Sequence, residues 1–133
     1  MSKALKAYAD STISTSVSMS TSSELIVLVF EKIFDYLKVG KAALENNQAA
    51  IEEFTKINDL INLGLVASLN REKGGEIAKN LEFIYLWTMN KITEARLTKS
   101  HEKIDEVTLV LMPIYESWKS LSSRKLIASK VAV

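Results

Sequence analysis

Apolar residues recur every three or four positions along four blocks of this 133-residue chain. That period places apolar side chains on one face of an α-helix. The pattern therefore predicts four helices, at about 23–44, 48–69, 75–97 and 101–121. The expected core face of the third helix carries Ile77, Leu81, Ile84, Ile92 and Ala95.

The junctions between the blocks are short and hold residues that end or begin helices. Asn46–Asn47 marks the first junction, Gly74–Gly75 the second, and Ser100 is a candidate N-cap for the fourth helix. Only four glycines and one proline are present, too few turn residues for an all-β domain. Short connections favour antiparallel neighbours. The sequence thus predicts an all-α fold, an antiparallel up-and-down four-helix bundle over residues 23–121, with Pro113 kinking the last helix.

The two ends of the chain have a different composition from the blocks. Ten of the thirteen positions in 11–23 are Ser or Thr, a composition that cannot bury enough surface to order itself. We therefore expect residues 1–22 to form a flexible N-terminal segment with one short amphipathic turn near its start. Residues 122–133 are expected to form a basic, frayed tail.

Composition excludes several kinds of function. The chain has no cysteine and one histidine, which excludes disulfides, thiolate metal sites and any site that needs two imidazoles. The net charge of +1 argues against nucleic acid as the main partner. No catalytic constellation, metal site or cofactor motif is evident, so we expect no enzyme and no cofactor.

Nothing in the sequence predicts insertion into a membrane. The longest apolar run, Leu25–Phe30, is far shorter than the roughly 20 residues that a membrane helix needs. The first residues also lack the apolar stretch of a secretory signal. We therefore expect a cytoplasmic protein.

Large apolar residues on the polar sides of two helices suggest an interaction surface. On a helical wheel, Phe83, Leu86 and Trp87 point away from the apolar stripe of the third helix. Leu63 and Val66 do the same in the second helix. A helix that touches two neighbours has a wide stripe, which explains Val66 but not the other four together. Exposed apolar groups of this size mark a binding surface, here a groove for an amphipathic partner helix.

The chain resembles the FliS family of flagellar secretion chaperones. The similarity rests on LNREKGGEIA at 69–78 and on IDEVTLVLMPIYESW at 104–118, with Ala7–Tyr8 and the LIVLVFE stretch before them. It departs from the usual family residues at several positions, where this chain has Ser22–Ser23, Asn70, Thr88 and Arg96.

The resemblance implies a cytosolic chaperone that binds the disordered C-terminal segment of flagellin. Such a chaperone prevents premature polymerisation and delivers flagellin to the cytoplasmic domain of the export gate, with no ATP implied. In the family an apolar-x-x-Tyr element is implicated in docking at the gate, and it corresponds here to Leu5 and Tyr8. Two alternatives remain open: a self-associating structural bundle, and a regulatory adaptor that binds another flagellar protein, such as an anti-sigma factor or a co-chaperone.

Overall fold

The computed structural model describes the backbone of residues 22–131 and the side chains of residues 23–124. This part of the chain is helical with no strand, which confirms the all-α bundle. Its elements are α2 (Ser22–Glu45), α3 (Ile51–Asp59), the π-helix η2 (Leu60–Val66), α4 (Arg71–Thr98) and α5 (His101–Val131). Leu5, Tyr8 and the rest of residues 1–21 lie outside the described residues.

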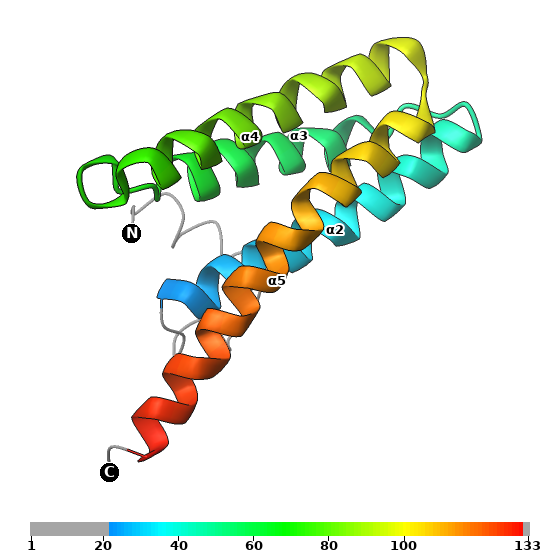
Figure 1. Cartoon of the computed structure of the whole chain (residues 1–133). Helices are drawn as coiled ribbons and strands as arrows, with labels where there is room; N and C mark the ends of the chain where they lie inside the picture. Colours follow the sequence, from blue (N-terminus) through cyan, green and yellow to red (C-terminus); the bar gives the residue numbers. More distant parts are fainter. Residues whose placement is uncertain (1–21, 132–133) are drawn as a thin grey trace.

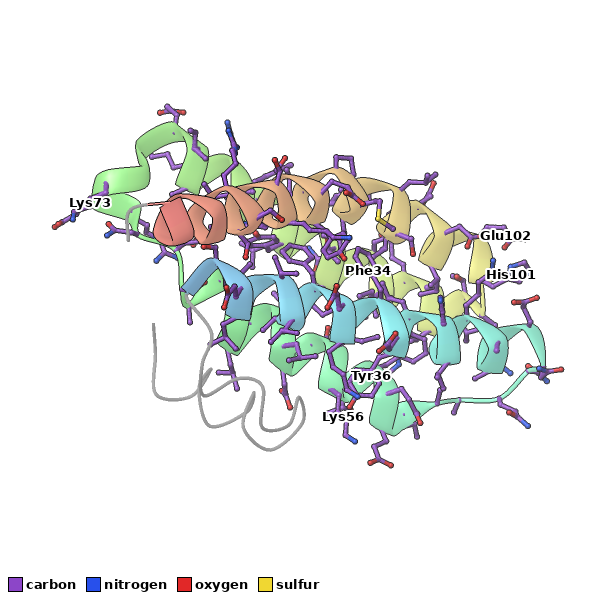
Figure 2. The ribbon with its side chains drawn as sticks, turned by 90° about the horizontal axis from the view of Figure 1, so that it is seen from below. Phe34, Tyr36, Lys56, Lys73, His101 and Glu102 are labelled. Atoms are coloured by element: carbon purple, nitrogen blue, oxygen red, sulfur yellow. The ribbon has the colours of Figure 1, made fainter. Side chains whose placement is uncertain are left out.

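The helices form a closed antiparallel ring. α2 packs on α3 and on α5, α4 packs on α5, and η2 contacts both α2 and α4. The α2–α3 and α4–α5 connections lie at one end, while α4 begins at the other (Figure 1). Polar and aromatic contacts join the helices, such as the hydrogen bond of 2.7 Å from the Tyr115 hydroxyl to Glu31 Oε2. On another side the Lys56 ammonium of α3 lies 5.5 Å from the Tyr36 ring of α2 (Figure 2).

Aromatic and β-branched side chains dominate the core. They stand at positions that the helical period predicts to be buried. Phe34 meets Tyr115 edge-on with ring centroids 5.4 Å apart, and Phe30 lies 6.4 Å from the ring of Tyr85. The largest fully buried side chains are Phe30, Ile33, Leu37, Phe54, Ile57, Leu60, Ile61, Leu65, Tyr85, Ile92 and Ile104.

The beginning of α4 differs from the sequence expectation. The helix starts at Arg71 after the N-cap Asn70, whose side-chain oxygen accepts a hydrogen bond of 3.0 Å from the backbone N–H of Lys73. Gly75 then interrupts it with φ 49° and ψ −123°, a conformation that glycine adopts without a Cβ clash. The expected place of Ile77 in the core is wrong: it is 71% exposed. Ile77 follows the break at Gly75, and it lines an open cavity at this end of the bundle instead of packing in the core.

The second block also differs in its winding. The predicted continuous helix begins at Ile51, after Ala50 in the left-handed region, and changes to a π-helix at Leu60. The backbone N–H of Ala67 donates to the Asn62 carbonyl at 3.2 Å, five residues back, as π-winding requires.

The last helix is longer than its apolar pattern suggests. We expected it to end near Leu121, but α5 continues to Val131. It also runs through Pro113, which lies inside the helix and is exposed.

Candidate functional site

Three of the five residues that the sequence assigns to a groove are exposed on two adjacent elements. Phe83 and Leu86 of α4 are 72% and 45% exposed, and Leu63 of η2 is 38% exposed. α4 and η2 are in contact. We call these three side chains the α4–η2 surface. Val66 is half-buried and packs against the core.

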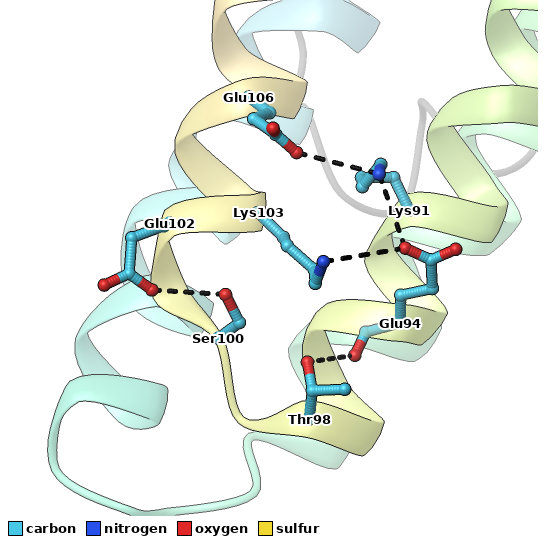
Figure 3. A network of polar contacts seen from close by, with 7 residues as sticks. All are labelled: Lys91, Glu94, Thr98, Ser100, Glu102, Lys103 and Glu106. Carbon is cyan, nitrogen blue, oxygen red and sulfur yellow. Dashed lines mark hydrogen bonds and ion pairs between the residues drawn. The ribbon is translucent and has the colours of Figure 1, made fainter.

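Trp87 does not belong to the α4–η2 surface. On a helical wheel it lies about 40° from Phe83, on the side away from Leu86. It is half-buried against the core, and the ammonium of Lys91 lies 5.5 Å from its ring. Lys91 is in turn 3.3 Å from Glu94 and 3.7 Å from Glu106 of α5 (Figure 3). Trp87 therefore lies on the α5 side of α4.

A cavity of about 480 Å³, here called the proximal cavity, opens at the end of the bundle where α4 begins. Its floor holds Tyr85, whose pKa is raised to about 12 by burial, although a hydrogen bond with Trp118 opposes the shift. The hydroxyl of Ser23, a residue 1% exposed, has no hydrogen-bond partner among the described residues. The apolar residues that line the cavity are Ile26, Leu65, Leu69, Ile77, Ala78, Leu81, Tyr85 and Trp118.

The sequence did not assign the proximal cavity to a site. The one feature of the sequence that points to the cavity is the Gly74–Gly75 pair, which the apolar pattern indicates only as a junction between two helices. A Cβ on Gly74 would lie 2.8 Å from the Cβ of Ala78, so the glycine allows this close approach. Together with the break at Gly75, this shapes the first turn of α4 that walls the cavity.

A polar cavity of about 330 Å³ lies between the second block and α4. Amide and hydroxyl side chains line most of it, together with Met89 and with Asp59 as the charged group. Asn62 and Asn90 are among these residues, and they stand one position before Leu63 and four after Leu86. The apolar surface is therefore bordered by hydrogen-bonding groups. This pattern suits an amphipathic partner better than a wholly apolar one.

The polar groups at the α4–α5 connection form structural contacts. His101 Nε2 lies 3.4 Å from Glu102 Oε1 of the same helix turn (Figure 2). The pKa of Glu102 is lowered by hydrogen bonds from its own backbone N–H and from the Ser100 hydroxyl. This contact, with Ser100 Oγ 3.1 Å from Glu102 Oε2, is drawn in Figure 3.

Metal-binding groups and membrane-spanning helices were sought in the described part of the chain. Within it, no cluster of three or more His, Asp or Glu side chains could hold a metal ion. No helix there combines the length and the apolar character that crossing a membrane requires. The arrangement offers apolar surface, cavities and hydrogen-bonding groups, which are means of binding another chain.

Comparison with known proteins agrees with a binding role. The model of the family described as "Flagellar protein FliS" matches residues 4–125. The flagellar secretion chaperone FliS of Salmonella typhimurium is 32% identical over 122 residues, which cover 90% of each chain. The chaperone FliSB of Pseudomonas aeruginosa is 30% identical over 122 residues, covering 90% of this chain and 96% of its own length. FliS of Vibrio cholerae is 27% identical over 123 residues. Because the family model spans nearly the whole sequence, this chain belongs to the FliS family of flagellar proteins.

Proposed function

We propose that this protein is a cytoplasmic flagellar export chaperone that binds the disordered C-terminal segment of flagellin. The observation that carries the proposal is the exposure of Phe83, Leu86 and Leu63 on two adjacent elements of the bundle. Single exposed apolar residues are ordinary, but a group of large ones marks an interaction site. Membership of a family whose relatives are named flagellar secretion chaperones supports the same conclusion.

The proposed mechanism is the covering of an amphipathic segment. A flagellin end that forms helices in the filament carries an apolar stripe, which pairs with other copies when it is free. When the segment lies on the α4–η2 surface, its apolar stripe can no longer pair with other flagellin copies. The segment is then also not packed against the rest of its own flagellin chain. The cost of ordering it, roughly 2–5 kcal/mol or more, keeps the complex reversible. Release then requires competing contacts at the export gate and no nucleotide.

Docking at the gate is assigned to Leu5 and Tyr8. The assignment follows from the position of the apolar-x-x-Tyr element in the family, and both residues lie outside the described structure. Deletion of residues 1–18 is expected to weaken binding to the cytoplasmic domain of the gate and to leave flagellin affinity equal or higher. A clear loss of flagellin affinity after the deletion would count against this division of roles.

Calorimetric titration with the C-terminal segment of flagellin from the same genome tests the main proposal. We expect saturable one-to-one binding with a negative heat-capacity change, because apolar surface is buried as the segment folds. Absence of heat at two temperatures with a folded bundle refutes flagellin as the partner. A stable multimer that takes up no peptide would favour the self-associating bundle, so solution mass is measured on the same sample.

A further inference from the structure

A third cavity lies at the opposite end of α4 from the proximal cavity. This distal cavity has a volume of about 450 Å³ and lies between the α2–α3 connection and the last turn of α4. Ile51 and Leu97, which are 62% and 81% exposed, both line it. Two of the most exposed large apolar side chains in the described part of the chain thus line the same cavity.

The charged residues that line the distal cavity are all basic. They are Arg96 and Lys99, and no carboxylate is among the lining side chains. Arg96 lies over the Phe54 ring at 5.5 Å, which fixes its position. The ion pairs formed by the described side chains include neither Arg96 nor Lys99, and the nearby Glu52 is 3.1 Å from Lys56. The cavity therefore combines apolar walls with two positive charges that lack an acidic partner among these side chains.

Left-handed residues turn the backbone around the distal cavity. Three non-glycine residues in the described chain have positive φ: Asn47 at 57°, Ala50 at 48° and Lys99 at 53°. Asn47 and Lys99 line the cavity, and Ala50 lies between two residues that line it. Asn47 and Lys99 take this conformation where α2 and α4 end, as residues after a helix commonly do, and Ala50 takes it directly before α3. These turns set the shape of the cavity.

One helix can reach both the α4–η2 surface and the distal cavity. Leu97 follows Leu86 by eleven residues, which is three turns plus about 20°, so both side chains lie on one face of α4. A rise of 1.5 Å per residue separates them by about 16 Å along the axis. A partner helix that covers Phe83 and Leu86 and continues along α4 therefore arrives at Ile51 and Leu97.

We propose that the distal cavity is a second docking site for an acidic amphipathic helix. Carboxylates of the partner pair with Arg96 and Lys99, and an adjacent apolar side chain packs on Ile51 and Leu97. As the extension of the segment that covers the α4–η2 surface, this site rests on the proposed function. It adds a chemical requirement: the partner carries Asp or Glu three helical turns from its apolar contact with Leu86.

Two synthetic peptides test the site without flagellin. Both are about 20 residues long, enough to span the two sites at 1.5 Å per residue. They share one apolar stripe and carry either Glu or Lys at the polar positions of one end. In titrations of the full chain at low salt, we expect the Glu peptide to bind at least tenfold more tightly. The difference should shrink as salt rises, because exposed charges are screened.

Charge reversal locates the effect. The double variant Arg96→Glu, Lys99→Glu is expected to abolish or invert the preference for the Glu peptide. Lys99→Glu alone, at an exposed residue, is expected to lower it in part, and this variant serves if the change at Arg96 disturbs Phe54. The control Lys38→Glu, Lys119→Glu makes the same change in net charge outside the cavity and should leave the preference intact. Circular dichroism verifies that each variant is folded.

The outcomes separate this site from the proposed function. Equal affinity for the two peptides, binding of neither, or a preference that survives the double reversal overturns the distal site. The flagellin segment is titrated in parallel. If it fails to bind while the Glu peptide depends on Arg96 and Lys99, the proposed function fails and the acidic docking site stands. If flagellin binds and neither reversal changes any affinity, the proposed function stands without the distal site.

Discussion

The change Phe83→Ser separates binding from stability at the α4–η2 surface. Phe83 is 72% exposed, so about 28% of it is covered in the free protein. A fully buried Phe removes 150–250 Å² from water, and 28% of the middle value of about 200 Å² is roughly 56 Å². At about 25 cal/mol per Å² this contributes about 1.4 kcal/mol to folding as an upper estimate. The bundle is therefore expected to remain folded after the substitution.

The exposed part of Phe83 sets the expected effect on binding. A partner that covers all of it removes roughly 144 Å² from water, which is worth about 3.6 kcal/mol at the same coefficient. Because 1.4 kcal/mol is a factor of ten, the ceiling is a rise in Kd of about 400-fold. Incomplete burial lowers the effect, so we expect a rise between about 10-fold and that ceiling.

The assay pairs titration of the flagellin segment with urea unfolding followed by circular dichroism. Leu109→Ser is the matched control, because Leu109 is 74% exposed and lies on α5. It should lose as little stability as Phe83→Ser and keep wild-type affinity. Unfolding of Phe83→Ser, or an unchanged Kd, refutes the reasoning. An equal loss of affinity in both variants would show that exposure alone, not position, determines the effect.

Three further predictions concern the bundle itself. Gly75→Ala is expected to lower the free energy of unfolding by about 1–3 kcal/mol, measured by urea unfolding, because alanine must adopt φ 49° and ψ −123°. Gly40→Ala should cost about 1–2 kcal/mol in the same assay. The new Cβ would lie 2.6 Å from the ring of Phe54, which is 0% exposed, and overpacking outweighs the gain of about 1 kcal/mol in helix propensity. Burial raises the pKa of Tyr85 from 10.0 to about 12, which favours the protonated folded state. Its contribution is full below pH 10 and is lost between about pH 10 and 12, by about 3 kcal/mol at most.

Each of these predictions has its own control. A Cβ at Gly75 meets nothing within 4 Å, so its cost is purely a backbone cost, and a D-alanine introduced by chemical synthesis should restore stability. For Gly40→Ala, adding Phe54→Leu should recover part of the loss, because a smaller side chain relieves the clash. Tyr85→Phe removes the titrating group, so its stability should fall less steeply above pH 10 than that of the wild type. An identical pH profile for the two proteins would contradict the assigned pKa.

Much of the fold follows from the helical period, and the exceptions have local causes. Phe54, Ile57, Ile92 and Ile104 are buried as their spacing predicts. Ile77 is not, because it stands in the first turn after the break at Gly75 and lines the open proximal cavity. A hydrophobic pattern gives the face of a helix that is apolar, but not the point at which the neighbouring helices stop covering that face.

The candidate site was partly predictable for the same reason. Phe83 and Leu86 lie opposite the stripe on a regular stretch of α4, so the wheel placed them correctly on the outside. Trp87 lies about as far from the buried residues of α4 on the wheel as Leu86 does, but it packs against the core on the side of α5, and Val66 packs against the core as well. The distal cavity could not be predicted from a wheel. Its walls come from two connections and a helix end, and its shape depends on left-handed residues such as Ala50.

The π-helix η2 gives the chain one place where a change of length can be absorbed by the winding of the backbone. Its windings close on the fifth residue, so the segment holds more residues per turn than the α-helix before it. Loss of one residue here would let the segment relax to ordinary α-winding, and the residues after it would keep their orientation relative to α3. Loss of one residue from the regular α-helix of α3 would instead rotate everything after it by about 100°. Leu65 would then leave the core, and Leu69 would leave the proximal cavity. Within the family, single-residue changes of length are therefore expected to be tolerated better inside Leu60–Val66 than inside Ile51–Asp59.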